Sequence, residues 1–370
     1  MNTNIFLGSL ALTSAIGLSG CDLIIGIEPW SAGGAGGQSV STASTAETSS
    51  SGMTFLPPSL TAPVEAQILA PSHAYVSWQD GPIPPNVSVT SYQLCYTTGP
   101  LSGIVGDADC PNAALTTSRR NVLDPLSAKR SYALKVRTLF DDNSVSAWSV
   151  IRAFSTDDTL AGWWRMDGNS NDLSPFAHAG VLQNGAAYEA GLVDQALLLD
   201  GIDDQMTVAN TNDHNFGTGD FTLAAWIFPL RDGVAEALIT KRSSSNGYEL
   251  FRTTGGQLAF FGSGCGIAAM GGSLPIDEWH RAAVVRAGGM IFLTIDGIAV
   301  GTGNCGDDFN NTSSLALGCN GQDIGCVEPF QGRIDEASIR TAASNDADLA
   351  NDLCADLVQA GVDPLPSMCL

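Results

Sequence analysis

The chain has 370 residues, 44% of them hydrophobic, a length and composition suited to two or three domains with buried cores. Its 38 Asp and Glu residues outnumber 16 Lys and Arg residues, which gives a formal net charge of -22. Such a surface repels phosphate backbones and anionic lipid headgroups, so the composition argues against nucleic acid as a partner. The acidic balance fits either solubility outside the cell or carboxylates gathered for calcium.

The N-terminal segment has the pattern of an export signal. Residues 1–20 contain no charged side chain, and their apolar stretch from Ile5 to Ile16 is too short for a comfortable membrane span. A Leu-Ser-Gly tripeptide then precedes Cys21, which resembles the lipobox of bacterial lipoproteins. The resemblance implies a signal peptide at 1–20, lipidation of Cys21, and a lipid-anchored location in the cell envelope, at the outer membrane or cell surface. An ordinary secretory signal with an incidental cysteine is the alternative.

Residues 21–60 have the composition of a flexible tether. From Ser31 to about Ser59 the chain is mostly Gly, Ser, Thr and Ala, with few apolar side chains to offset the entropy of ordering. We therefore expect the lipidated N-terminus and a linker here, with the membrane contacted only through the anchor.

Eight cysteines remain after Cys21, and an even number in an exported chain indicates disulfides. Eight cysteines allow 105 pairings. The expected domain boundaries favour four local pairs, which are Cys95 with Cys110, Cys265 with Cys305, Cys319 with Cys326, and Cys354 with Cys369. A metal site is the weaker alternative, because no CxxC pair occurs and the four histidines are isolated.

Residues 61–157 show short alternating strands separated by turn residues, which predicts an all-β domain. Period-two apolar patterns surround Trp78, Tyr92 and Tyr132. With Trp148 near the end, these residues resemble a fibronectin type III sandwich. The resemblance implies that Tyr132 is the tyrosine-corner residue, whose hydroxyl bonds to backbone upstream.

Residues 158–342 form a longer all-β region, whose length suits a large sandwich. Five different motifs follow one another along this region, at 162–167 (GWWRMD), 199–204 (LDGIDD), 221–227 (FTLAAWI), 291–297 (IFLTIDG) and 330–339 (FQGRIDEASI). Together they resemble the laminin G-like domains of the concanavalin A-like lectin and glucanase fold. The resemblance implies a jelly-roll sandwich. At 343–370, Ser344 or Asn345 can cap a helix that Gly361 closes, and we expect this helix to pack onto the sandwich.

Calcium is the first candidate ligand. Jelly rolls often bring their first and last strands together, so Asp167, Asp172 and Asp335 are expected to converge, and carboxylate oxygens suit this hard cation. The alternative is that Asp335 bonds only to strand ends. Asp203 and Asp204 can equally be polar turn residues.

Carbohydrate is the second candidate ligand, because aromatic faces stack on sugar rings. Trp226, Tyr248 and Phe261 are the residues that we expect to serve. Trp226 lies on the opposite strand face from Leu223 and its neighbours, so one of these two faces should be less buried. The alternative for Trp226 is plain core packing.

The sequence predicts no catalytic site. Retaining glycosidases need two carboxylates about 5 Å apart, whereas Asp335 and Glu336 are adjacent and point to opposite strand faces. Serine-nucleophile and HExxH motifs are missing. We therefore expect non-catalytic binding, with extracellular carbohydrate as the first candidate. A surface protein as partner in adhesion or envelope assembly is the alternative, and glycoside hydrolysis ranks below both.

Overall fold

The structure is a computed structural model that describes residues 55–70, 72–99, 110, 112–244, 246–321 and 325–369. The expected signal peptide, Cys21 and nearly all of the tether lie outside these residues. Strands dominate the described chain and one α-helix follows them, which confirms the all-β class with a short C-terminal helix. Among the described residues, no helix is long and apolar enough to cross a membrane.

Among the described residues, the first sandwich has eight strands in two sheets. They are β1 (Ser59–Ala62), β2 (Gln67–Leu69), β3 (Ala74–Gln79), β4 (Val89–Thr98), β5 (Asn112–Thr116), β6 (Arg120–Leu123), β7 (Ser131–Phe140) and β8 (Arg152–Thr156). One sheet has the order β1-β3-β6 and the other β2-β8-β7-β4-β5. Trp78, Tyr92 and Tyr132 are buried between these sheets, as predicted. The Tyr132 hydroxyl accepts a hydrogen bond of 2.7 Å from the backbone N–H of Ser127, the expected upstream contact.

The described part of the second sandwich has fifteen strands. They are β9 (Leu160–Trp164), β10 (Val181–Gln183), β11 (Ala187–Ala190), β12 (Gln195–Asp200), β13 (Gln205–Val208), β14 (Phe221–Pro229), β15 (Glu236–Arg242), β16 (Gly247–Arg252), β17 (Leu258–Gly262), β18 (Gly266–Gly271), β19 (His280–Ala287), β20 (Met290–Ile295), β21 (Ile298–Asn304), β22 (Leu315–Leu317) and β23 (Gln331–Arg340). A 3-10 turn, η3 (Asn212–His214), precedes β14.

Two antiparallel sheets face each other across one apolar core, which is the expected jelly-roll sandwich. The seven-stranded sheet has the order β10-β13-β22-β15-β16-β17-β18. In the eight-stranded sheet the order is β11-β12-β23-β14-β19-β20-β21, with β9 also pairing with β23. Side chains at alternate positions fill the space between the sheets, because successive strand residues point to opposite faces.

The two sheets approach closely where their last strands, β18 and β21, meet. A Cβ atom on Gly271 would overlap the carbonyl oxygen of Val300, and one on Gly303 would overlap that of Ala268. Side chains at these glycines would therefore force the strands apart. The disulfide Cys265–Cys305 joins the same region.

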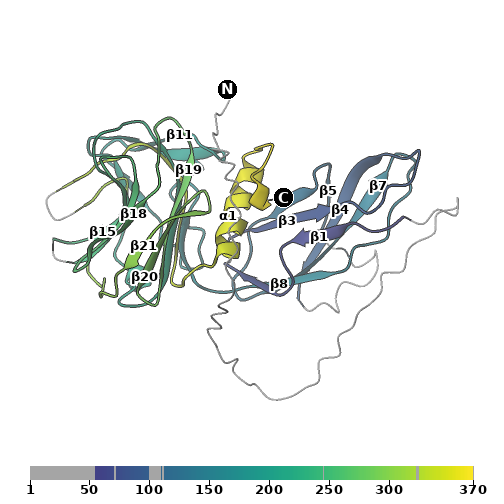
Figure 1. Cartoon of the computed structure of the whole chain (residues 1–370), viewed down its shortest axis with the longest axis horizontal. Helices are drawn as coiled ribbons and strands as arrows, with labels where there is room; N and C mark the ends of the chain where they lie inside the picture. Colours follow the sequence, from purple (N-terminus) through teal and green to yellow (C-terminus); the bar gives the residue numbers. More distant parts are fainter. Residues whose placement is uncertain are drawn as a thin grey trace, which may run out of the picture.

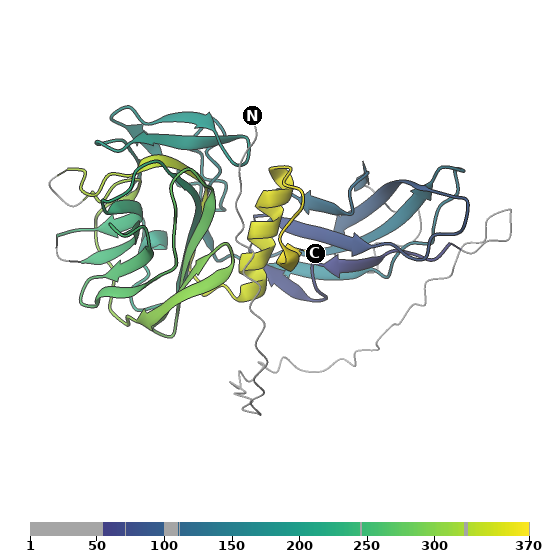
Figure 2. The ribbon, with the colours of Figure 1, turned by 45° about the horizontal axis from the view of Figure 1, so that its top comes forward.

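The C-terminal helix α1 (Asp346–Gln359) lies between the two sandwiches (Figures 1 and 2). Asn345 caps it, with its side chain accepting from the backbone N–H groups of Ala347 and Asp348. Gly361 follows with a φ of 70°, as the predicted helix end requires. Another 3-10 turn, η4 (Ser367–Cys369), folds back against the helix, and the bond Cys354–Cys369 holds it there.

Two buried carboxylates of α1 bind basic side chains of both sandwiches. Nη2 of Arg340 lies 2.5 Å from Asp352, and Nη2 of Arg281 lies 3.3 Å from the same carboxylate. Arg281 also bonds to Asp356. From the first sandwich, Nε2 of His73 lies 3.7 Å from each carboxylate. Burial opposes ionisation of Asp352, yet Arg340 and Arg281 hold its pKa below the usual value.

Further polar contacts join the first sandwich to the rest of the chain. Asn351 on α1 accepts from the backbone N–H of Tyr75 at 2.9 Å, and the Tyr75 hydroxyl donates to the carbonyl of Cys369. Between the sandwiches, Arg165 and Asp124 form an ion pair of 2.8 Å. The expectation that α1 packs onto the larger sandwich is therefore met, and the helix contacts the smaller sandwich as well.

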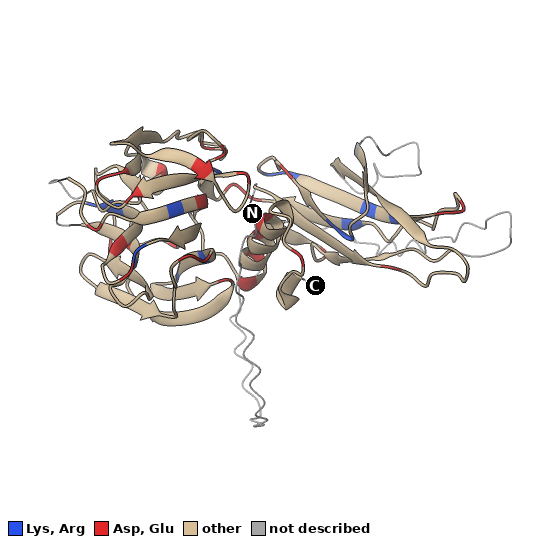
Figure 3. Ribbon diagram, turned by 90° about the horizontal axis from the view of Figure 1, so that it is seen from above, with Lys and Arg blue, Asp and Glu red and all other residues tan. Residues whose placement is uncertain are grey.

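All four disulfides have the predicted pairing, which is Cys95–Cys110, Cys265–Cys305, Cys319–Cys326 and Cys354–Cys369. Asp and Glu positions are spread over the ribbon of both sandwiches and along α1 (Figure 3). The disulfides indicate an oxidising compartment and therefore an exported protein.

We predict that Asp352→Ala destabilises the protein by about 3–5 kcal/mol, because it leaves two buried guanidinium groups without their shared carboxylate. Urea denaturation of the oxidised chain measures the change. Asp346→Ala is the matched control, since Asp346 is exposed in the first turn of the same helix and should cost less than about 1 kcal/mol. Equal losses in the two variants would contradict the role of Asp352.

Candidate functional site

The outer face of the seven-stranded sheet carries a groove of about 670 Å³. Strand alternation creates this face. In β16, Tyr248 and Leu250 point into the core, so Glu249 and Phe251 point outward. In β17, Phe260 is a core residue and the next residue, Phe261, lines the groove.

Cross-strand register places the outward residues in rows. Glu249 in β16 lies opposite Phe261 in β17, and Phe261 lies opposite Ile267 in β18. A β-bulge between Phe260 and Phe261 keeps Met270 on the groove face as well. Ile267 is 56% exposed and Met270 is 49% exposed. The floor of the groove is therefore an accessible apolar strip.

Polar groups border this strip. They comprise the side chains of Arg242, Glu249, Thr253, Thr254, Gln257 and Glu328. An apolar floor with a few polar groups at its margin is the usual composition of a small-molecule or sugar site. The arrangement can therefore bind an amphipathic ring, whose apolar face meets the strip and whose hydroxyl groups meet the margin.

Two glutamates meet at one margin of the groove. The Asn320 side-chain amide donates to Oε2 of Glu249 at 3.0 Å and to Oε2 of Glu328 at 3.2 Å. Nη1 of Arg242 donates to the same oxygen of Glu249 at 2.5 Å. Glu249 is only 1% exposed, and its other oxygen has no hydrogen-bond partner in the described structure.

Burial raises the pKa of Glu249 to about 8, and the neighbouring Glu328 carboxylate contributes in the same direction. Arg242 acts in the opposite sense but does not compensate. Burial therefore favours the protonated form of Glu249.

A short disulfide-bonded loop positions Glu328. Cys319 and Cys326 close the loop, and Asn320 and Val327 pair across it as an isolated β-bridge. Glu328 has a φ of 55°, an uncommon backbone conformation for a non-glycine residue, and its carbonyl accepts from a backbone N–H of β15. The loop thus holds the carboxylate at a fixed place on the groove margin.

Of the three aromatic residues predicted for carbohydrate, the structure places Phe261 in the groove. The guanidinium of Arg242 covers one face of its ring at 3.9 Å from the centroid. Tyr248 is fully buried in the core, and its hydroxyl donates to the carbonyl of His214. Its prediction as a sugar platform is therefore wrong, because a ligand cannot reach the ring.

Trp226 is also excluded as a platform, since it is only 1% exposed. Its ring lies on the outer face of the eight-stranded sheet, and α1 covers that face with Leu353 and Leu357. The indole N–H donates to Asp356 at 2.8 Å. The expectation that one face of β14 is less buried did not allow for a helix from the C-terminus.

The predicted calcium ligands Asp167, Asp172 and Asp335 do not converge. Asp172 and Asp335 each accept hydrogen bonds from three backbone N–H groups, and Asp167 forms an ion pair of 3.1 Å with Arg165. Within the described ranges, these three carboxylates do not bring one oxygen each within 4.8 Å of one another. The prediction of one shared cation at these residues is therefore wrong. Asp335 has the alternative role, bonding to backbone at strand ends.

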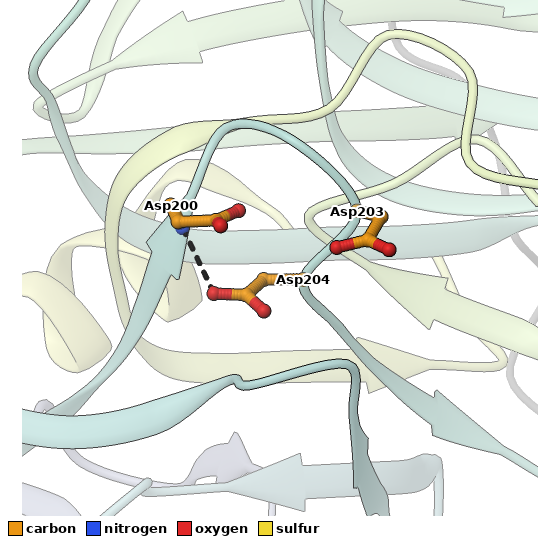
Figure 4. A group of neighbouring side chains, drawn as sticks. All are labelled: Asp200, Asp203 and Asp204. Carbon is orange, nitrogen blue, oxygen red and sulfur yellow. Dashed lines mark hydrogen bonds between the residues drawn. The ribbon is translucent and has the colours of Figure 1, made fainter.

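A different acidic group does converge. Asp200 ends β12, and Asp203 and Asp204 lie in the turn before β13, with one oxygen from each within 4.8 Å of the others (Figure 4). Asp200 and Asp203 are exposed, whereas Asp204 is buried. The motif LDGIDD marked this turn in the sequence, but its spacing alone did not distinguish ligands from turn residues.

The glutamate pair in the groove was not predicted either. Glu249 lies on a strand and Glu328 on a loop far along the chain, and only the register of β15, β16 and β22 brings them together. A solitary Glu within an apolar strand, beside Tyr248 and Leu250, was the available signal.

We predict that Glu249→Gln stabilises the protein progressively as the pH rises from 4 to 8. The folded-state pKa of about 8 exceeds the unfolded value of about 4.3, so ionisation opposes folding between these values, by at most about 1.4 kcal/mol per pH unit. Well below pH 4 the Glu249 carboxyl is neutral in both the folded and the unfolded state. The pH-dependent part of the stability difference between variant and parent then vanishes. Thermal unfolding across this range measures it.

The matched control is Glu189→Gln, at an exposed position of β11. Its stability relative to the parent should stay level across the same pH range. A constant difference for Glu249→Gln, parallel to the control, would show that the groove carboxyl is ionised in the folded protein and contradict the assignment.

Comparisons with known proteins agree with the fold of the larger sandwich. Residues 200–350 match the family model Laminin_G_3, described as the concanavalin A-like lectin/glucanases superfamily. No curated protein matches the sequence. Solved structures that resemble the chain include domain 4 of AbnA, a GH43 extracellular arabinanase from Geobacillus stearothermophilus in complex with arabinotriose, at 19% identity and a TM-score of 0.44. That similarity covers 53% of this chain and 98% of the other.

Two toxin structures are also similar. The binding domain of Paraclostridial Mosquitocidal Protein 1 has 16% identity and a TM-score of 0.40, covering 52% of this chain and 51% of the other. The binding domain of botulinum neurotoxin serotype D has 13% identity and a TM-score of 0.41, covering 55% and 52%. The chain thus spans about half of each toxin domain. We infer no function from similarities this distant. The family match at residues 200–350 and the two facing antiparallel sheets agree on a concanavalin A-like jelly-roll fold for the larger sandwich.

Proposed function

We propose that this chain binds extracellular carbohydrate, without catalysis, in the groove on the seven-stranded sheet. The observation that carries the proposal is the composition of the groove, in which Phe261, Ile267 and Met270 form an accessible apolar strip between polar margins. Sugar rings have an apolar face and a hydroxyl-bearing rim, and such a groove complements both.

The glutamate pair favours binding over hydrolysis. A glycosidase acid must touch the glycosidic oxygen, whereas Glu249 is almost completely buried and its carboxylate is engaged by Arg242 and Asn320. In our proposal, Glu249 fixes the positions of Arg242 and of the loop that carries Glu328. Glu328, which is partly exposed, is then the carboxylate that accepts hydrogen bonds from ligand hydroxyl groups.

A protein partner is the second candidate. The exposure of Ile267 and Met270 favours it, because aliphatic side chains at the centre of a groove also suit a partner's apolar side chain. The two candidates differ in whether a free oligosaccharide displaces the bound partner from the groove. Free oligosaccharides would displace a glycan from the groove, but they would not displace a protein bound through aliphatic contacts.

We further propose that the smaller sandwich, at 61–157, is a fibronectin type III-like domain that holds the larger one, at 158–342, away from the membrane. Its sheets of three and five strands and the tyrosine-corner contact of Tyr132 support this assignment. Residues 343–370 then join the two as helix and tail. Lipidation of Cys21 and a tether over 21–60 complete a lipoprotein displayed from the cell envelope.

The direct test of binding is a glycan array probed with the oxidised chain that lacks residues 1–20. Selective binding that is displaced by the free oligosaccharide would support the proposal. A blank array, together with recovery of a surface protein that protects the groove, would support the second candidate instead. Release of reducing sugar from the bound glycans would overturn the proposal of binding without catalysis.

We predict that Phe261→Ala weakens binding of the selected glycan by about 5- to 30-fold, since loss of one stacking ring costs roughly 1–2 kcal/mol. Calorimetric titration measures the affinity. Phe292→Ala is the matched control, because Phe292 is a partly exposed phenylalanine of β20, on the other sheet. Unchanged affinity in Phe261→Ala, or an equal loss in the control, would refute the groove as the site.

The anchor has its own prediction. Cys21→Ala should abolish incorporation of labelled fatty acid and release the protein from the membrane fraction, because the thiol is the attachment point in the lipobox pattern. Ser19→Ala, in which a small residue remains before the cysteine, serves as the control and should retain the label. Labelling that persists in Cys21→Ala would refute lipidation at this residue.

A further inference from the structure

The turn between β12 and β13 brings three carboxylates within reach of one cation. One oxygen from each of Asp200, Asp203 and Asp204 lies within 4.8 Å of the others. A calcium ion has ligand distances of about 2.4 Å, so a single ion between these oxygens can contact all three. Figure 4 shows that the three side chains come from the same turn, with Asp203 and Asp204 across it from the end of β12.

A second observation points to a missing ligand. Asp204 is only 5% exposed. Its Oδ2 accepts from the backbone N–H of Asp200 at 3.1 Å, but its Oδ1 is buried and has no hydrogen-bond partner within the described structure. An unpartnered buried carboxylate oxygen is costly, because it has lost water without gaining a donor or a cation. A cation bound in the turn supplies the partner.

The charged groups around the turn do not supply a partner for Oδ1 of Asp204. Burial raises the pKa of Asp204, and the charges of Asp200 and Asp203 raise it further. The basic side chain of Arg231 contacts the turn, where its Nη1 donates to the carbonyl of Gly201. Its Nε forms an ion pair with Glu236 instead. In the described part of the chain, no ion pair neutralises the three aspartates of the turn.

The ligand set indicates which cation fits. All three side chains offer only oxygen, which suits a hard cation and disfavours zinc, whose sites use histidine and cysteine. Because Asp200 and Asp203 are exposed, water can complete the six to eight ligands that calcium requires. The Asn184 side chain donates to the carbonyl of Asp203 at 2.8 Å and so helps to hold the turn in this shape.

We infer that the turn at 200–204 is a calcium site, formed by the carboxylates of Asp200, Asp203 and Asp204. It lies at residues other than those where the sequence predicted calcium, and it is independent of the carbohydrate proposal. The bound ion joins the end of β12 to the start of β13, and these strands belong to different sheets of the sandwich. Calcium therefore fastens the two sheets together at this end.

The experiment compares chelated and calcium-loaded protein. The oxidised chain is treated with EDTA, dialysed, and titrated with calcium chloride by calorimetry and by thermal unfolding. We expect a saturable isotherm and a rise in the unfolding temperature. Asp203→Asn, at an exposed position that can be changed without disturbing the core, should weaken calcium binding by at least tenfold and shift the response to correspondingly higher calcium.

Three further variants test whether the calcium response comes from this turn. Asp346→Asn, at an exposed carboxylate of α1, should keep the full calcium response and so controls for general charge. Asp167→Asn should also keep it. Asp200→Asn is a second exposed ligand change, and it should weaken binding as Asp203→Asn does.

The inference is overturned if calcium gives no isotherm and no thermal shift. It is equally overturned if both Asp200→Asn and Asp203→Asn bind calcium as the parent does, or if the response disappears in Asp167→Asn alone. Magnesium chloride at the same concentration is the ion control, and it should produce the smaller shift, because magnesium demands regular octahedral geometry.

Discussion

The architecture depends on the buried charge network between α1 and the two sandwiches. Asp352 and Asp356 on the helix engage Arg281 and Arg340 from the larger sandwich, with His73 approaching from the smaller one. Buried charges are tolerated only when they are paired, so the network requires one specific position of the helix. The two sandwiches consequently meet through a shared polar centre, in addition to the apolar contacts that cover it.

This placement of α1 decides which surface remains for binding. The helix occupies the outer face of the eight-stranded sheet, where Trp226 and Trp279 join its apolar cluster. The outer face of the seven-stranded sheet has no such cover over Phe261 and Ile267 among the described residues, and there the groove lies. The bond Cys354–Cys369 fixes the end of the covering segment. The outer face of one sheet thus packs against the helix, and the outer face of the other sheet carries the groove.

The sequence predicted most of the fold and little of the site. Period-two patterns and ordered motifs identified both sandwiches, and local pairing predicted every disulfide, because these features depend on neighbours along the chain. The burial of Trp226 depends on a helix from the distant C-terminus, and the meeting of Glu249 with Glu328 depends on strand register. Neither can be read from local spacing. Phe261, which the sequence predicted to contact carbohydrate, lines the groove, because a single strand position determines its face.

The close contact between β18 and β21 has a consequence for the behaviour of the protein in crowded surroundings. Terminal strands of open sheets expose hydrogen-bonding groups that recruit strands of other molecules. Here glycines 271 and 303 let the two terminal strands shield one another. Strand addition from another molecule is therefore hindered at this margin. A ligand of the adjoining groove therefore contacts the face of the sheet. It does not bind by pairing as an extra strand along the edge of β18.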